Sequence, residues 1–218
     1  MNKRVFENID TEEKAYWLGF ILADGYLYDN ERHKHLSLGV GEKDVKHLYK
    51  FLDLFGASEE EKKTIIHQQF GGAYTRDNIV YYAIVCGKDL INDLKKYHLF
   101  QRKSGKEKPF IFSNPDLERA YIRGIFDGDG YIRSTQYGFG FVGSFEVMNY
   151  IHDFCNRIFN NSFEKVHVTT HGKIFRFATN GFNKTKEFLD YIYKDASIYL
   201  DRKYSLYQEL YCRDKTAE

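Results

Sequence analysis

The chain carries two copies of one apolar segment, separated by about half its length. Residues 16–27 read YWLGFILADGYL and residues 121–132 read YIRGIFDGDGYI. Aligned without a gap, at an offset of 129 − 24 = 105, the copies match at five positions, which are Tyr16/Tyr121, Gly19/Gly124, Asp24/Asp129, Gly25/Gly130 and Tyr26/Tyr131. An internal repeat of this kind predicts two halves of similar structure.

The residues that follow each copy resemble each other too. An alternating apolar stretch predicts a strand in each half, and a stretch with apolar residues at helical spacing predicts a helix after it. Further apolar strands and another amphipathic helix complete each half. The sequence therefore predicts an α+β fold of two pseudo-symmetric αββαββα halves, residues 1–105 and 106–218, joined by a linker at 105–115. The segments concerned are 35–40, 44–56, 79–85, 137–142, 146–159, 166–170 and 174–178.

Each copy is expected to form a buried helix, because segment 15–23 is apolar on nearly every side. Helix-start signals precede both copies, at 10–13 and at 114–116. Small residues stand four apart on one face, as Gly19 and Ala23 and, in the second copy, as Gly124 and Gly128. This spacing lets two helix backbones approach closely, so a central helix pair is predicted.

Asp24 and Asp129 end these two helices, each directly before a glycine. The end of a helix already carries partial negative charge, so an acid there is electrostatically unfavourable. If the helices pack side by side, the two carboxylates converge, and such a pair either takes up a proton or recruits cations. Hard divalent ions such as Mg²⁺ prefer oxygen ligands from carboxylates, water and phosphate. Paired metal sites of this kind suit phosphodiester hydrolysis.

Composition excludes several classes of protein. The three cysteines Cys86, Cys155 and Cys212 are far apart in the sequence, which argues against a disulfide framework or a zinc site and favours a reducing compartment. The first residues lack the apolar stretch of a secretion signal, and the longest apolar run, 15–23, is about half of a membrane span. A cytoplasmic or organellar-matrix location is expected. The net charge of +1 gives only weak support for a nucleic-acid partner but does not exclude one, because acidic residues elsewhere can balance a basic face.

The two motifs, WLGFILADG at 17–25 and IRGIFDGDG at 122–130, resemble those of the LAGLIDADG homing endonucleases. The resemblance covers nearly the whole chain. It implies antiparallel β saddles on both halves that grip double-stranded DNA, with the motif helices between them. It also implies a monomeric, metal-dependent hydrolase, acting in intron homing, that cuts both strands at a long asymmetric site and leaves 3′ overhangs. Asp24 and Asp129 match the metal-binding acids, with Mg²⁺ as the expected ion and Mn²⁺ or Ca²⁺ as substitutes.

Four further residues match positions near the catalytic water in that family. Lys103 and Lys203 stand in the Arg-Lys segments that close the two halves, although a solvated lysine at a helix end is the structural alternative. Glu42 and Ser144 occupy equivalent positions before the helix that follows the first two strands. Neither is the glutamine common in the family, so their role is the weaker prediction.

Basic residues on or beside the predicted strands are candidates for contacts with phosphate or guanine. They are Arg32, Lys34, Lys43, Arg76, Arg133, Lys173 and Arg176.

Other interpretations of the sequence are less favoured. Residues 138–143 spell GxGxxG but follow no convincing buried strand, and residues 127–130 lack the later ligands of a calcium loop. His33 and His35 are expected in an exposed turn before a strand, and the charged run 59–63 is expected to be a solvated turn. A maturase that binds RNA, or a DNA-binding regulator, is the main alternative function. An intein endonuclease is disfavoured because Met1 and residues 215–218 lack splicing residues.

Overall fold

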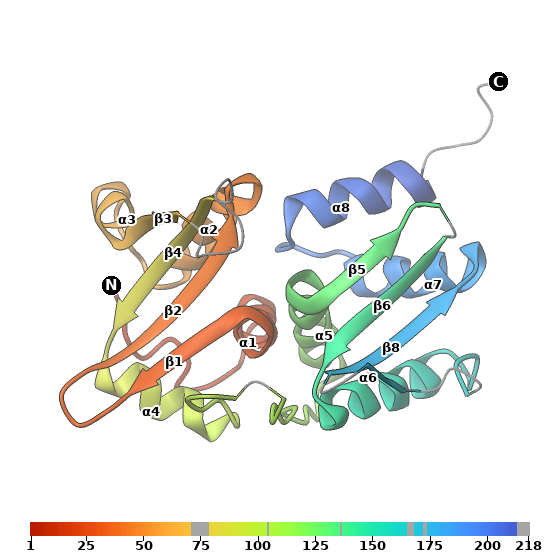
Figure 1. Cartoon of the computed structure of the whole chain (residues 1–218), viewed down its shortest axis with the longest axis horizontal. Helices are drawn as coiled ribbons and strands as arrows, with labels where there is room; N and C mark the ends of the chain where they lie inside the picture. The colour runs from red at the N-terminus through yellow and green to blue at the C-terminus, as the bar shows by residue number, and fades with distance from the viewer. Residues whose placement is uncertain (71–78, 104, 136, 165–167, 172–173, 213–218) are drawn as a thin grey trace.

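The computed structural model describes residues 1–70, 79–103, 105–135, 137–164, 168–171 and 174–212. Figure 1 shows two similar parts, each with one sheet, on either side of two central helices. This is the α+β architecture that the repeat predicts.

The first part contains one four-stranded sheet and the helices that connect and flank its strands. Its elements are α1 (Glu12–Asp24), β1 (Gly25–Asp29), β2 (Lys34–Gly41), the 3₁₀ turn η1 (Glu42–Asp44), α2 (Val45–Leu54), α3 (Glu59–Ile65), β3 (Ile66–Phe70), β4 (Ile79–Cys86) and α4 (Lys88–Lys96).

The second part repeats this plan after a connection without helix or strand among its described residues. Its elements are α5 (Pro115–Asp129), β5 (Gly130–Arg133), β6 (Gly138–Gly143), α6 (Phe145–Ile158), β7 (Thr169–His171), β8 (Ile174–Asn180), α7 (Phe182–Tyr193), α8 (Asp201–Tyr207) and the π turn η2 (Gln208–Cys212).

Both sheets are antiparallel and have the same topology. Their strand orders are β1-β2-β4-β3 and β5-β6-β8-β7. The registers correspond as well, since Gly25 pairs with Leu38 and Gly130 pairs with Phe141. Alternating residues such as Leu36 face the core, while the opposite face of each sheet remains for other contacts.

Helices α1 and α5 pack side by side at the centre (Figure 1) because glycines remove the side chains between them. A Cβ atom on Gly19 would lie 2.1 Å from the Tyr121 carbonyl oxygen, and one on Gly124 would lie 2.0 Å from the Tyr16 carbonyl oxygen. One on Gly128 would lie 2.4 Å from the Cβ of Ala23. The predicted small-residue contact is therefore confirmed at both glycine positions of the repeat.

One hydrophobic core runs through both parts and includes the central helices. Trp17 and Phe20 of α1 and Phe126 of α5 are among the largest fully buried side chains. Because the two sheets share this core, the ends of α1 and α5 are held in a fixed relation to both. No helix in the described part of the chain is both long and apolar enough to cross a membrane.

One expectation about local structure was wrong, and the ends of two helices differ from what their residue types usually favour. The run 59–63 is not a turn but the start of α3, where Ser58 and Glu61 form a capping box that nucleates the helix. Asp44 gives α2 no side-chain cap, because its carboxylate binds Arg202 instead. Gly25 has an ordinary φ of −77°, so the glycine is required by the close approach of the Ile21 carbonyl, at 2.6 Å from a Cβ there, and not by a left-handed turn.

Candidate active site at the ends of the paired helices

The two motif carboxylates lie at neighbouring helix ends. Asp24 is the last residue of α1 and Asp129 is the last residue of α5. The Oδ2 atom of Asp24 lies 3.3 Å from the place of a Cβ on Gly128, so Asp24 rests against the last turn of α5, directly beside Asp129. Asp24 is exposed and Asp129 is half-buried, so both groups reach solvent. The predicted convergence is present.

Their environment disfavours two negative charges in the absence of a cation. Desolvation by surrounding protein atoms and, next, the charge of Asp24 raise the pKa of Asp129 to about 7, against the opposing effect of Lys103. Desolvation likewise raises the pKa of Asp24, against the effect of Lys203 and Lys103. Two carboxylates that repel each other enough to retain a proton would also be stabilised by a bound cation, because either positive charge reduces the repulsion.

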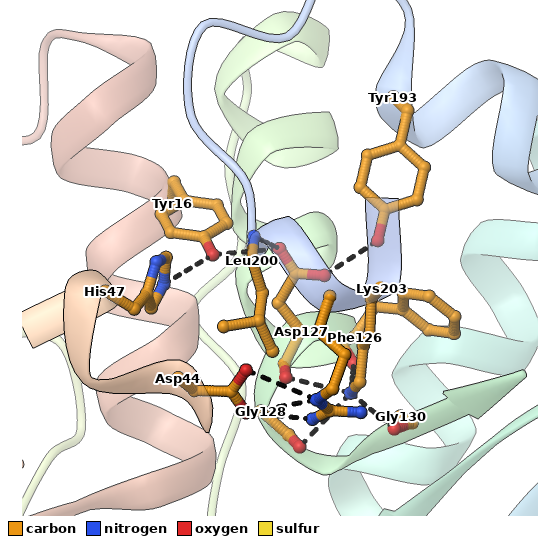
Figure 2. Close-up of polar contacts among 11 residues, drawn as sticks. Tyr16, Asp44, His47, Phe126, Asp127, Gly128, Gly130, Tyr193, Leu200 and Lys203 are labelled. Carbon is orange, nitrogen blue, oxygen red and sulfur yellow. Dashed lines mark hydrogen bonds and ion pairs between the residues drawn. The ribbon is translucent and has the colours of Figure 1, made fainter. Parts of the chain in front are cut away.

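Lys103 and Lys203 close the ends of the two helices in equivalent ways. The Lys103 ammonium donates to the Leu22 carbonyl at 2.6 Å and to the Ala23 carbonyl at 3.1 Å. The Lys203 ammonium donates to four carbonyls near the end of α5, those of Phe126, Asp127, Gly128 and Gly130 (Figure 2). Both lysines are buried. They satisfy carbonyls that the helix leaves unpaired and neutralise its negative end.

Burial lowers the pKa of both lysines, that of Lys203 to about 8. Apart from its largest charge partner, Asp127 for Lys203 and Glu107 for Lys103, each lysine interacts more strongly with the motif acid of the opposite helix than with that of its own half. After desolvation, Lys203 has the largest effect on the pKa of Asp24, whereas Lys103 has a larger effect than Lys203 on the pKa of Asp129. The four charged groups thus form a crossed arrangement around the junction of the two helices.

Two acids that the sequence did not mark lie close enough to affect this cluster. Asp44 raises the pKa of Asp24, and its carboxylate receives hydrogen bonds from the Nε and Nη2 atoms of Arg202 at 3.1 and 3.0 Å. Glu107 raises the pKa of Asp129. One of its oxygens accepts from the Gly105 amide at 3.1 Å, and the other is buried without a hydrogen-bond partner among the described residues.

No simple sequence signal identifies these acids. Asp44 stands where a helix cap is expected, and Glu107 stands in the linker, outside the repeat. Only the path of the chain past the helix ends brings them to the site.

Glu42 and Ser144 differ in their surroundings. Glu42 is exposed in η1, beside Lys43 and Asp44 at a surface pocket of about 300 Å³. Ser144 is buried, donates to the Glu107 carbonyl at 2.6 Å and accepts from the Val147 amide at 3.2 Å as the cap of α6. This geometry favours a structural role for Ser144, and a catalytic role for either residue stays a prediction.

The basic candidates of the first sheet lie at the ends of its strands β1 and β2. Arg32 is exposed in the turn between β1 and β2, and Lys43 is exposed in η1. Lys34 begins β2 and forms an ion pair with Asp29, which leaves it less available to DNA. Arg76 lies outside the described residues.

On the second sheet, Arg133 and Arg176 flank one tyrosine. Both guanidinium groups lie over the ring of Tyr131, at 5.5 and 5.4 Å from its centre, and the Arg176 Nε donates to the Tyr131 hydroxyl at 2.7 Å. The Tyr131 hydroxyl lies 2.5 Å from the place of a Cβ on Gly140. Gly140 of the GxGxxG run therefore makes room for this aromatic side chain within β6. Lys173 lies outside the described residues.

The donor set fits a hard divalent cation that is only partly held by protein. Within the described ranges no group of three or more His, Cys, Asp or Glu side chains is arranged to enclose a metal. The converging pair, Asp24 and Asp129, offers carboxylate oxygens at a solvent-accessible place. Mg²⁺ is commonly bound in this way, through one or two carboxylates with water and substrate phosphates completing its shell.

Comparison with solved structures defines the fold class. The chain has the fold of the LAGLIDADG endonucleases, with two sheets around a central pair of motif helices. I-SmaMI bound to an uncleaved DNA target in the presence of calcium ions superposes with a TM-score of 0.59, covering 89% of this chain and 89% of that one at 11% identity. I-SmaMI, a LAGLIDADG homing endonuclease, bound to cleaved DNA gives a TM-score of 0.58 over 91% of this chain and 87% of that one at 13% identity.

A second kind of protein shares the fold. The N-terminal LAGLIDADG domain of DUF199/WhiA gives a TM-score of 0.54 over 94% of this chain and 93% of that one at 15% identity. No family model matches the sequence. In sequence, the chain is 31% identical over 141 residues to glutamine–fructose-6-phosphate aminotransferase of Methanocaldococcus jannaschii, a match of 62% of this chain and only 12% of that protein. That protein's activity is therefore not assigned to this chain.

Proposed function

We propose that this protein is a metal-dependent DNA endonuclease that hydrolyses both strands of a double-stranded target. The observation that carries the proposal is the meeting of Asp24 and Asp129 at the joined ends of α1 and α5, where burial and mutual repulsion raise the pKa of Asp129 to about 7. DNA-bound structures of I-SmaMI, which shares the fold, support a duplex as the substrate.

The chemistry follows from the donor set. Asp24 and Asp129 would hold Mg²⁺, or Mn²⁺ or Ca²⁺ in its place, and a bound ion of this kind activates water and stabilises the leaving oxygen in phosphodiester hydrolysis. Lys103 and Lys203 place positive charge beside the carboxylates and so favour the approach of a phosphate. Asp44 lies close enough to raise the pKa of Asp24, and Glu42 precedes it in the same 3₁₀ turn, so these two residues would orient water near the metal-binding acids.

The two parts of the chain would divide the target between them. Residues 1–105 and 106–218 act as half-domains in one monomer, each with its sheet laid along one half of a long site. Because the two sheets differ in sequence, the site is asymmetric. The exposed Arg32 and Lys43 and the Arg133–Tyr131–Arg176 cluster supply contacts to the duplex. Cleavage across the narrow groove by two adjacent acids would leave 3′ overhangs, and intron homing is the biological context.

A randomised duplex library tests the proposal. The wild-type protein is incubated with the library and Mg²⁺, and new ends are ligated to an adaptor and sequenced. Wild type should yield one family of double-strand ends, and Asp24→Asn and Asp129→Asn should each yield almost none. Asp153→Asn, at an exposed acid of α6, is the matched control and should cut as wild type does. Equal cutting by all four proteins would exclude the assigned acids.

A non-cleaving nucleic-acid binder, such as a splicing maturase that binds RNA or a DNA-binding regulator, is the second candidate. The lysine geometry is the observation in its favour, because both ammonium groups are occupied by backbone carbonyls. Capture of a defined duplex or RNA by wild type, with no new ends in Mg²⁺ or Mn²⁺, would favour this candidate.

A further inference from the structure

A buried hydrogen-bond network ties the segment before Lys203 to helix α5. Asp127 is 1% exposed. Its carboxylate accepts from the Leu200 amide at 2.7 Å and from the hydroxyls of Tyr193 and Tyr16 at 2.8 Å each (Figure 2). The Tyr16 oxygen also lies 2.9 Å from the Nε2 of His47. Since Tyr16 donates its only proton to Asp127, His47 must donate to Tyr16, so this chain of bonds reaches α2.

Arg123, one helical turn before Asp127 in α5, also binds the segment that precedes α8. The guanidinium group of Arg123, also 1% exposed, donates to the Ile198 carbonyl at 2.9 Å and to the Ile192 carbonyl at 2.8 Å. It also forms an ion pair with Glu12 at the start of α1. Arg123 and Asp127 together bind both ends of the stretch 192–200 that connects α7 to α8.

The position of this stretch decides where the Lys203 ammonium lies. Leu200 is the residue before α8, and its carbonyl accepts from the Lys203 amide at 3.0 Å. Lys203 thus stands in the first turn of a helix whose start is fixed by Asp127. A shift of Leu200 would move the ammonium away from the carbonyls that end α5 and away from Asp24.

The first half of the repeat has no such network among its described residues. At the offset of 105, Leu18 stands at the place of Arg123 and Leu22 at the place of Asp127. Both leucine side chains are buried in the apolar core and have no hydrogen-bonding group. Lys103 also lies outside any helix, after Arg102 with a left-handed φ of 58°. The two lysines are therefore positioned by different means.

We propose that Arg123 and Asp127 are positioning residues for Lys203, and that they support the cut in only one of the two DNA strands. The inference rests on the proposed function. A network that only stabilised the fold would affect both strands equally, whereas the structure links it to one lysine. Loss of the network should therefore slow one cut and leave the other.

The test compares strand-specific rates on the duplex that the wild type cuts, with a different fluorophore on each strand. Lys203→Met identifies the strand that depends on Lys203. Asp127→Asn and the milder Tyr193→Phe, which removes one hydroxyl donor, should slow that same strand by about tenfold to a hundredfold, and Lys103→Met should slow the other. Tyr150→Phe removes a comparable bond of 2.9 Å to Glu118, also on α5, and should slow neither.

Equal slowing of both strands by Tyr193→Phe, or slowing of the strand that depends on Lys103, would overturn the inference. If the wild type cuts no DNA, the proposed function fails, but positioning is still measurable. Amide hydrogen exchange over residues 196–204 should be faster in Tyr193→Phe than in wild type and unchanged in Tyr150→Phe. Unchanged exchange in both variants would refute the positioning role separately from the enzymatic one.

Discussion

Replacing Gly19 or Gly124 by alanine tests the close contact that brings the two acids together. Within a free helix either substitution would stabilise, since glycine costs about 0.5–1 kcal/mol relative to alanine. Here the new methyl group would meet a carbonyl oxygen at 2.1 or 2.0 Å, more than about 1 Å inside van der Waals contact. The obstacle is backbone, so no rotamer change can relieve it.

The expected net effect is a loss of stability. Overpacking of this kind costs about 1–3 kcal/mol, and the rigid partner places these sites at the upper end of that range. After the gain in helix propensity, each variant should lose about 2 kcal/mol. In a chain of this length that loss lowers the Tm by about 4–8 °C.

Urea and thermal unfolding followed by circular dichroism measure both quantities. Gly41→Ala is the control, because nothing lies within 4 Å of a Cβ there and its φ is −67°. Its stability should change by less than about 0.5 kcal/mol. If Gly19→Ala and Gly124→Ala are as stable as the control, the helices are not in the contact described and the acids are not held together by it.

Three further predictions follow from the charges around the site. Because burial and the neighbouring Asp24 raise the pKa of Asp129 to about 7, the folded state keeps a proton that the unfolded state releases near pH 4. The free energy of unfolding should therefore fall as the pH rises from about 4 to about 7. Urea unfolding at pH 5 and pH 8 measures this fall, and Asp129→Asn should abolish the part that Asp129 causes. Removing the Arg202–Asp44 pair should cost roughly 0.5–1 kcal/mol, and a double-mutant cycle should assign that coupling to the pair. Lys203→Met leaves more carbonyls unpaired than Lys103→Met, so it should lower the free energy of unfolding in urea further, by about 1–3 kcal/mol against wild type. A larger loss in Lys103→Met would contradict the assigned hydrogen bonds.

Most of the fold could be predicted from the internal repeat, because the spacing of its residues is a local property of the sequence. Gly19, Gly124 and the acids after them stand at fixed spacing in apolar helices, so the helix pair and the succession of helices and strands in each half could be inferred from one alignment. The charged first turn of α3 resembles a solvated loop in the sequence, whereas the structure shows that the capping box at Ser58 starts a helix there.

The site was predicted less completely, for a physical reason. Asp44 and Glu107 reach the acids only through tertiary packing, and neither belongs to a local pattern. The network of Asp127 was hidden in the same way, since its partners Tyr16, Tyr193 and Leu200 are distant in sequence. Arg76 and Lys173 lie outside the described residues, so their predicted DNA contacts stay predictions.

Anomalous diffraction from a crystal of the protein with Mn²⁺ and the duplex it selects tests the central claim most directly. We expect a manganese peak bridging the carboxylates of Asp24 and Asp129, next to a phosphate of the duplex. A peak bound elsewhere, or two carboxylates turned away from each other with no metal between them, would contradict the assignment of this helix junction as the catalytic site.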